Sequence, residues 1–574
     1  MQEDSAATAA PNRPSPLPWA VGGLVLLAVL VFLPHALDQF RLPKRLVLAA
    51  GVPALGAVFL SRRWRGAADR TLLVLGVAFL LWNLLAPVSA AANPTLHALG
   101  GLRLLLPWTL LPLTAAAASA GGAAGRRLAA LAGAAGTAVG ALALLQWSGA
   151  DPIARLFHAA SPGAGRWRIL TTVGNPGWTA ETVAAALPLA LAGLGPGRGR
   201  RALRAGLVLA AAAAVAVTGS RTGAVALAAG AGAWLAARRG GRRGRALLAG
   251  LATASAAGAV VLVLATTAGT ARLGDLAPLT GRLALWDAGA RLTARHPLTG
   301  NGLGHTAILL PEGLREVVAA APARWRPWLP TSLVDRLDDD WLQTALEAGL
   351  PAVLLLLAIW GRAAALAWRH APENGAAGAV GALAALGTGT LFSAPLHTPA
   401  TAVLFWTAAG IAGAGRPKPV PAGARRRRLA AAAALAAVAA GAAGAGAALV
   451  RLDLAAGRGR TLLRRGHAAA AVPPLDRAFR RAPWLVPAGV ELADALERTG
   501  RHAEALAVTI EAGRWTASER LWAIRARALA ASGHPGAART VLDRGLAVLP
   551  RSRILLAERT RLAATDSPNL SGSD

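Results

Sequence analysis

Long apolar runs recur along the first 450 residues of this chain. Each measures roughly 17–25 residues, which is the length that an α-helix needs to cross a bilayer. Only 15% of the 574 residues are charged, and the mean hydropathy is +0.46. A soluble domain carries about 25% charged residues. The first run is followed by many others, so it is not merely a cleaved signal peptide. The sequence therefore predicts an all-α fold: a polytopic membrane helical bundle followed by a soluble helical region.

Thirteen membrane spans are predicted. They lie near 18–36, 46–61, 71–88, 102–120, 128–147, 177–194, 203–219, 222–237, 246–266, 341–360, 376–392, 399–415 and 429–450. The spans 203–219 and 429–450 are rich in Ala and Gly and only weakly hydrophobic. Because small residues permit close helix packing, we expect these two spans inside the bundle or in tight contact with neighbours.

The distribution of Arg and Lys predicts the orientation. Basic loops at 62–70, 125–127, 197–204, 238–245, 361–369 and 416–428 alternate with loops poor in basic residues. Cytoplasmic loops carry the excess of Arg and Lys, so the N-terminal tail 1–17 is predicted to be cytoplasmic. The loops 148–176 and 267–340 then lie outside. The segment 38–45 is an exception, because it is basic yet falls on the outer side.

The net charge of +32 could indicate a nucleic-acid partner. The basic residues lie mostly in the short loops between apolar runs, where membrane topology requires them. We therefore predict a lipid bilayer, and no nucleic acid, as the environment that these charges serve. The chain has no cysteine, which excludes a disulfide framework and a Cys-ligated zinc site.

The region 451–565 has a period of about 34 residues. Gly466, Gly500 and Gly533 are 34 and 33 residues apart, as are Ala471, Ala505 and Ala538. This spacing resembles a tetratricopeptide array of paired helices, which binds proteins on a concave face. An odd span count places this region outside the cytoplasm, where we expect envelope proteins as its partners. Residues 566–574 are predicted to form a disordered tail.

Four polar patches lie in or beside the predicted outer loops, at 166–181, 218–223, 281–305 and 336–351. Ionisable residues at membrane depth are costly, so they mark function by default. Each patch alone also has a simpler explanation: a turn, an interfacial Arg, a flexible glycine loop, or a carboxylate at a helix N-terminus.

Taken in order, the patches resemble motifs of the O-antigen ligase and O-antigen polymerase superfamily of membrane glycosyltransferases. The resemblance rests on four elements that run through residues 150–360. They are Gly174-Asn175-Pro176; Ser220-Arg221-Thr222; Arg282 with Trp286, His296-Pro297-Leu298, Gly300, Gly302 and Gly304; and Asp338-Asp339-Asp340-Trp341-Leu342-Gln343 with Glu347 and Gly349. The chain departs from the family at 338–339, where Asp-Asp replaces His-Asn. In the family, that His is a candidate catalytic residue.

The resemblance implies a GT-C-like enzyme at the outer face of the inner membrane. Such an enzyme transfers a glycan from an undecaprenyl-pyrophosphate carrier to an acceptor hydroxyl on lipid A core, another glycan or a protein, in lipopolysaccharide biosynthesis. An O-antigen-type polymerase is the alternative within the family, and the acceptor that separates the two is not legible in the sequence. Outside the family, the alternatives are a transporter of lipid-linked glycans and a non-catalytic envelope scaffold.

Arginine binds phosphate oxygens bidentately and stays charged, so it suits the pyrophosphate leaving group. The predicted pyrophosphate ligands are Arg221, Arg282 and Arg168, with Arg103 a weaker candidate and Asn175 and Ser220 in support. The predicted general bases are Asp338, Asp339 and His305.

Helical spacing places Asp339 or Asp340 on one face with Gln343 and Glu347, and we expect this face to line a wet cavity or to contact the cations. No cofactor is predicted. The alternatives for the triple Asp are a divalent cation held at Asp338–Asp340 and a helix cap.

Overall fold

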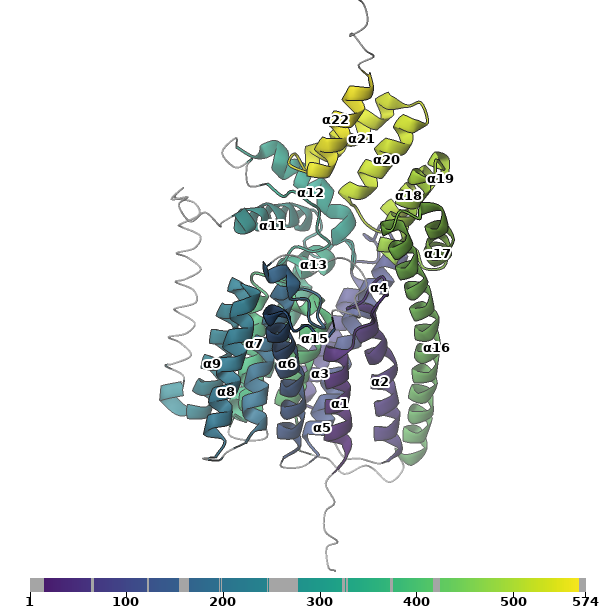
Figure 1. The fold of residues 1–574 in the computed structure, drawn as a ribbon. Coiled ribbons are helices and arrows are strands. Elements are labelled where there is room, and N and C mark those ends of the chain that lie inside the picture. The colour runs from purple at the N-terminus through teal and green to yellow at the C-terminus, as the bar shows by residue number, and fades with distance from the viewer. Residues whose placement is uncertain are drawn as a thin grey trace, which may run out of the picture.

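The computed structural model describes residues 15–62, 67–120, 123–153, 165–195, 197, 199–244, 246, 277–322, 326, 329–371, 375–416 and 424–566. Regular structure in these ranges is helical, with no strand among them, which confirms the predicted all-α class. The helices form a bundle, and a smaller group of helices lies above it in Figure 1.

The bundle begins with α1 (Leu17–Leu30), α2 (Leu42–Ser61), α3 (Arg70–Leu85), α4 (Pro94–Trp108) and α5 (Leu110–Ala118). It continues with α6 (Ala124–Ser148), α7 (Pro176–Gly193), α8 (Arg201–Thr218) and α9 (Arg221–Arg239). After two outer helices come α13 (Asp340–Arg369), α14 (Ala376–Gly389), α15 (Pro399–Ala412) and α16 (Arg425–Arg464).

Each predicted span except the one near 246–266 coincides with a described helix or, at 102–120, with the pair α4 and α5. Apart from Ala246, the span 246–266 lies outside the described residues, as do 1–14, 154–164, 267–276 and 567–574. Among the described helices, six are long and apolar enough to cross a membrane: α2, α4 with α5, α6, α8, α13 and α16. Four more, α1, α3, α14 and α15, are apolar but shorter. The count of thirteen stays a prediction.

The centre of the bundle is α15, whose residues Pro399–Ala412 are all buried. A helix that is apolar on every side lies in the interior. Its neighbours α7 and α14 are almost as deeply buried. The most deeply buried helices of the bundle are therefore α15, α7 and α14.

The two Ala/Gly-rich helices do not lie inside the bundle. Only 22% of the apolar window of α8 and 6% of that of α16 is buried. The helix α16 packs along α2, and at Gly446 and Gly457 it comes close to Leu46 and to the backbone of His35. Small residues here allow close contact with one neighbour while the opposite face stays open to lipid.

The predicted outer segment 267–340 is partly helical. It contains α11 (Ala277–Arg295) and α12 (Thr306–Ala320), which lie across the upper end of the bundle (Figure 1). It leads into α13, where Gly349 breaks the helix with φ +81°. A Cβ on Gly349 would lie 2.0 Å from the carbonyl oxygen of Leu298, so only glycine lets the 297–304 loop reach this position.

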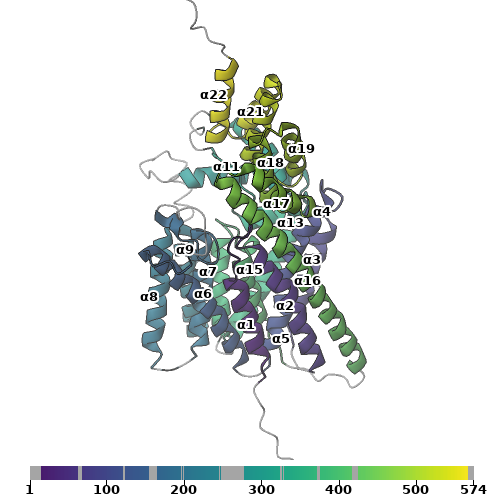
Figure 2. The same cartoon turned by 45° about the vertical axis from the view of Figure 1, so that its right-hand side comes forward.

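The region after 450 forms six helices beyond α16. They are α17 (Ala468–Arg481), α18 (Val486–Arg498), α19 (His502–Gly513), α20 (Glu519–Ala531), α21 (Pro535–Val548) and α22 (Arg553–Asp566). We call α17–α22 the tail. Figure 2 shows it stacked above the bundle at the end of α16. Its helical character agrees with the prediction, and the tetratricopeptide assignment stays a prediction.

The repeated glycines mark equivalent helix ends in the tail. Gly466, Gly500 and Gly533 all have positive φ, of 86°, 76° and 80°. The next residue in each case donates its N–H five residues back, as in His467 to the Leu462 carbonyl. This is the Schellman pattern, which requires a left-handed residue and favours glycine. The period of about 34 residues in the sequence thus corresponds to the spacing of the helix C-termini at which these glycines lie.

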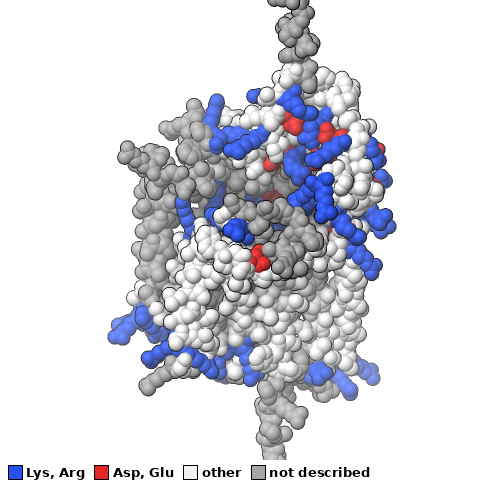
Figure 3. Space-filling view, in the orientation of Figure 1, with Lys and Arg blue, Asp and Glu red and all other residues white. Residues whose placement is uncertain are grey.

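Basic side chains gather at the end of the bundle opposite the tail. Figure 3 shows Lys and Arg along the lower end, whereas the acidic side chains visible on this face lie higher. The helix ends there carry Arg62, Arg126, Arg127, Arg200, Arg201, Arg238, Arg239, Arg369 and Arg425–Arg428. This arrangement fits the predicted cytoplasmic side.

Candidate functional site

A cavity of about 420 Å³ lies between the bundle and the tail. It is bounded by the α1–α2 connection, α3, α4, the start of α13, the α14–α15 connection and the tail. Its charged lining residues are Arg41, Arg45, Arg103, Arg336, Asp38, Asp335, Glu347 and Asp453, together with His397. Its apolar lining includes Leu48, Phe79, Leu104, Pro107, Leu356 and Trp406. The cavity thus combines charged side chains with an apolar wall of bundle residues, and the lining from the tail is also largely apolar (Trp484, Leu485, Val486, Pro487 and Trp515).

Two arginines of the cavity are held by the Gly-Asn-Pro element. The side chain of Asn175 caps α7 by accepting hydrogen bonds from the backbone N–H of Gly177 and Trp178. Trp178 then lies between two guanidinium groups, 5.1 Å from Arg41 and 4.6 Å from Arg336. Such cation–π contacts orient the guanidinium without neutralising it.

Asp335 links the same two arginines. Its carboxylate is 2.8 Å from Arg41 and 3.3 Å from Arg336. Burial would raise the pKa of Asp335, but the charges of Arg336 and Arg41 outweigh burial and hold its pKa well below the usual range. Asp335 is therefore ionised, and two arginines share one carboxylate.

Arg45 of α2 and Arg103 of α4 also face the cavity. Neither has a carboxylate within salt-bridge distance in the described part of the chain. Arg45 is repelled by Arg103 and Arg41 and attracted by Asp38. Arg103 is repelled by Arg41 and attracted by Glu347, Asp335 and Asp38. The acidic lining residues are already engaged, because Glu347, Asp453 and Asp38 accept hydrogen bonds from the backbone N–H groups of Gly304, Asp38 and Arg41, respectively. This is an arrangement that a bound anion would stabilise.

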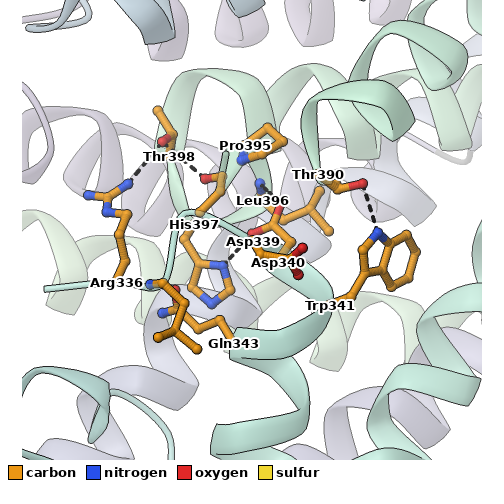
Figure 4. A network of polar contacts seen from close by, with 12 residues as sticks. Arg336, Asp339, Asp340, Trp341, Gln343, Thr390, Pro395, Leu396, His397 and Thr398 are labelled. Atoms are coloured by element: carbon orange, nitrogen blue, oxygen red, sulfur yellow. Dashed lines mark hydrogen bonds and ion pairs between the residues drawn. The ribbon is translucent and has the colours of Figure 1, made fainter. Parts of the chain in front are cut away.

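A buried carboxylate and a histidine meet at the start of α13. Asp340 is fully buried, and its Oδ1 is 2.6 Å from Nδ1 of His397 (Figure 4). Its Oδ2 accepts the backbone N–H of Leu396 at 2.8 Å. The backbone N–H of Asp340 and the indole N–H of Trp341 both donate to Thr390. These bonds hold the start of α13 against the α14–α15 connection.

His397 is the ionisable group best placed to move a proton in the cavity. Its side chain is 31% exposed and lines the cavity. Because Nδ1 is held by Asp340, Nε2 is the nitrogen left for a ligand. Burial lowers the pKa of His397, but the hydrogen bond and charge of Asp340, aided by Glu347, outweigh burial and raise the pKa above its ordinary value. A histidine oriented by a carboxylate is a common arrangement for general acid–base chemistry.

The predicted bases Asp338 and Asp339 have other partners. Asp338 has φ +53° and lies 3.7 Å from the guanidinium of Arg282. Asp339 caps α13, accepting the backbone N–H of Leu342 at 2.7 Å. Burial raises the pKa of both carboxyl groups, that of Asp339 to about 6. The cap interpretation of the triple Asp therefore describes Asp339 well.

The predicted base His305 is fully buried and engaged on both nitrogens. Its Nε2 accepts the backbone N–H of Asn93 at 3.0 Å, so its Nδ1 carries the proton and donates to the Leu303 carbonyl. Burial lowers its pKa. In this position His305 joins the 300–305 loop to the start of α4.

Gln343 and Glu347 lie on the buried side of α13 and reach the cavity. Glu347 accepts three hydrogen bonds, from the Gly304 N–H (2.9 Å), the Thr306 hydroxyl (2.6 Å) and the Gln343 amide (3.2 Å). The glutamate thus fixes the glycine-rich loop against α13.

The predicted pyrophosphate ligands do not all meet at the cavity. Arg103 lines it, whereas Arg168, Arg221 and Arg282 do not. Arg221 begins α9, where Ser220 caps the helix by accepting the Gly223 N–H. Arg282 is placed one helical turn before Trp286, whose indole donates to the Leu337 carbonyl at 3.0 Å.

The three carboxylates Asp338–Asp340 do not converge. They point to Arg282, to the α13 N-terminus and to His397, respectively. A divalent cation needs several oxygen ligands directed at one point. The residues present therefore do not fit a cation at this position.

Arg41, Arg45, Arg336 and His397 are not among the site residues predicted from the sequence, although Arg336 opens the polar patch 336–351. The signal for the first two was present, since 38–45 is the basic segment that contradicts the positive-inside pattern. No motif marks His397. Glu181 of α7 was also missed: it is 3% exposed, its Oε2 has no hydrogen-bond partner among the described residues, and it interacts electrostatically with Asp338, Asp340 and Arg282.

The apolar helices define a multi-pass membrane protein, and a cavity lined by charged side chains lies at their tail-facing end. Residues 205–357 match the family model described as O-antigen ligase. Among curated proteins, none matches the chain. This match covers about a quarter of the chain and supports a ligase or glycosyltransferase role in a membrane. The matched range includes Arg221, Arg282 and Asp338–Glu347, whereas Arg41, Arg45, Arg103 and His397 lie outside it.

Proposed function

We propose that this protein transfers a glycan from a polyprenyl-pyrophosphate carrier to an acceptor hydroxyl. The observation that carries the proposal is the cavity. It combines two arginines that lack carboxylate partners among the described residues, a carboxylate-held histidine and an apolar wall, and its floor lies partly in the domain that matches O-antigen ligases. That family implies a lipid-linked glycan donor.

The lining supports this donor chemistry. A pyrophosphate placed near Arg45 and Arg103 would satisfy charges that the protein leaves unmatched, and Arg41 and Arg336 would flank it. The apolar wall on the bundle side offers a path for the first isoprene units toward the bilayer. The cavity volume lies within the roughly 300–1,000 Å³ typical of ligand sites.

The reaction requires one proton transfer. The acceptor oxygen forms a bond to C1 of the donor sugar while the bond between C1 and the phosphate oxygen breaks. Nε2 of His397 takes the proton of the acceptor hydroxyl, and Asp340 stabilises the imidazolium that results. Polyprenyl pyrophosphate leaves as an anion held by the arginines. His397 thus fills the role that the family's missing histidine at 338 leaves open.

We place this reaction at the outer face of a bacterial inner membrane, with the tail outside. The gathering of basic side chains at the opposite end supports this orientation. Ligation and polymerisation share the chemistry above and differ in the acceptor, and a polymerase remains the alternative.

The test is the pH dependence of transfer in a cell-free assay with the lipid-linked glycan extracted from producing cells. The base must be neutral, so wild-type transfer should fall as pH decreases through a value above 6.5, the ordinary pKa of His. His397→Ala should lose at least about 100-fold in turnover, the lower end of general-base effects. In Asp340→Asn, burial lowers the pKa of His397 and the Asp340 carboxylate no longer raises it. The fall of transfer on the acid side of the pH profile should therefore move to lower pH, and turnover should decrease.

The matched control is His370→Ala, at the other end of α13, which should behave as wild type. If Asp338→Asn abolishes the acid limb and His397→Ala retains it, Asp338 is the base, as the sequence predicts. Donor binding without transfer in the wild type would favour the transporter or scaffold alternatives.

A further inference from the structure

The tail is fixed to the bundle by contacts that flank the cavity. The Asn93 side chain donates to the Arg514 carbonyl at 3.0 Å, and the Ala517 N–H donates to the Ala307 carbonyl at 3.2 Å. Glu519 accepts the Leu333 N–H at 3.2 Å. Val548 and Leu549 belong to one buried apolar cluster with residues of α11 and α12. In this structure the tail therefore covers one side of the cavity and is held there by these contacts. We call this covering part of the tail the roof of the cavity.

The turns within the tail's helix pairs are the parts that face the bundle. The turns after α17 and α19 contribute Trp484 and Trp515 to the cavity lining, and the turn after α21 packs on α11 and α12. The repeat thus brings equivalent turns to one side, and two of the three carry tryptophan.

The two tryptophans form a pair. Their ring centroids are 6.4 Å apart with planes inclined at 62°. Trp515 is 8% exposed and supports Trp484 edge-on, while Trp484 is only partly buried and keeps surface open to the cavity. The indole N–H of Trp515 is 3.4 Å from Glu511, so its orientation is also fixed from within the tail.

We propose that Trp484, supported by Trp515, is the stacking platform of a saccharide subsite, so that the tail is part of the reaction site. This inference rests on the proposed function. If the pyrophosphate lies among the arginines and the polyprenyl chain runs along the apolar wall into the bundle, the sugar must extend to the opposite side. The tail's tryptophans occupy that side.

The chemistry of the platform suits a sugar. One face of a pyranose presents C–H groups, which pack on the negative face of an indole, while its hydroxyls stay free for polar partners. The saccharide can belong to the donor or to the acceptor, and the two sources make different predictions.

The experiment uses the full-length protein in lipid nanodiscs and the variant Trp484→Ala. Binding is measured for two probes, undecaprenyl pyrophosphate and the glycan-bearing lipid extracted from producing cells. With a donor-side platform, Trp484→Ala should weaken binding of the glycan-bearing lipid about tenfold and leave the sugar-free lipid unchanged. With an acceptor-side platform, both lipids should bind as before, and the KM for the acceptor should rise about tenfold. Trp484→Phe should recover part of either loss.

Ile510→Ala is the control, since this residue is 56% exposed on the tail. If Trp484→Ala leaves both the lipid affinities and the acceptor KM at the wild-type values, the platform is overturned while the proposed function stands. If the wild type binds neither lipid, the proposed function itself fails, and the subsite inference falls with it.

Discussion

At the scale of single residues, the cavity is unusual for its cations. Arg103 is carried on a predicted span and Arg45 lies directly before one, where an unpaired charge costs several kcal/mol unless water or an anion reaches it. Arg41 and Arg336 share Asp335 and stack on Trp178. A protein keeps such groups close together when a ligand of opposite charge occupies the space between them.

We therefore expect Arg103→Ala to weaken binding of undecaprenyl pyrophosphate by at least about tenfold, which is 1.4 kcal/mol and within the range of a charge-assisted hydrogen bond. Arg103→Lys should recover only part of this loss, because an ammonium group cannot form the bidentate fork. Nanodisc binding assays measure both effects.

Arg239→Ala is the matched control for the loss of one positive charge. Arg239 ends α9 at the end of the bundle opposite the tail, far from the cavity lining. Unchanged binding in Arg103→Ala together with a loss in Arg221→Ala and Arg282→Ala would move the pyrophosphate to the ligands predicted from the sequence.

At the scale of elements, α13 connects the outer loop to the cavity. It begins at the Asp339 cap, presents Asp340, Gln343 and Glu347 on its buried side, and breaks at Gly349. The 297–304 loop docks at this break, where the Leu350 N–H donates to the Pro297 carbonyl and the Gly302 N–H donates to the Glu347 carbonyl. The residues around Glu347 and Gly349 that resemble the family motif are therefore the place where the 297–304 loop packs against α13. We call this contact the α13 joint.

Gly349→Ala should destabilise the protein by about 1–3 kcal/mol, because the residue is left-handed and its Cβ would meet the Leu298 carbonyl. Gly361→Ala in the same helix has no atom within 4 Å of its Cβ and should be neutral or slightly stabilising. Thermal unfolding in detergent compares the two. Equal midpoints would mean that the loop does not depend on this joint.

At the scale of the whole molecule, one set of basic side chains lies at the end of the bundle opposite the tail (Figures 1 and 3). Basic side chains at the lower end predict a cytoplasmic face there, and the same rule predicts that the cavity and the tail lie outside. The basic segment 38–45, which contradicts this rule, folds at the tail-facing end and supplies Arg41 and Arg45 to the cavity. Two of the basic residues that break the positive-inside pattern thus line the cavity.

Reporter fusions at positions 240, 300, 420 and 500 should read inside, outside, inside and outside. A cytoplasmic signal at 500 would reverse the tail and remove it from any reaction at the outer face. Fusion at 300 and 420 controls for insertion of the preceding helices.

The sequence predicted the helices well because their signal is local. Apolar runs gave α1–α9 and α13–α16, and a glycine period gave the helix ends of the tail. The cavity was only partly predicted. Gln343, Glu347 and Arg103 were identified, but Arg336 and His397 reach the site through pairings across more than 50 residues, with Thr398 and Asp340. Such contacts leave no period in the chain. The sequence also cannot distinguish an exposed histidine from a buried one, and His305, predicted as a base, is buried with both ring nitrogens hydrogen-bonded.

The helix α16 runs without interruption from Arg425 to Arg464, out of the predicted bilayer and into the tail. Because the helix is continuous, residues added to it would both rotate the tail and shift it along the helix axis. One residue added within it would turn the tail by about 100° and lift it about 1.5 Å, which would swing Trp484 away from the arginines. Seven added residues would nearly complete two turns and restore the facing, with the roof about 10 Å higher. The gap between the lipid surface and the roof is thus adjustable only in steps of whole helical turns, and this stepwise spacing would set how bulky a glycan can pass beneath the tail.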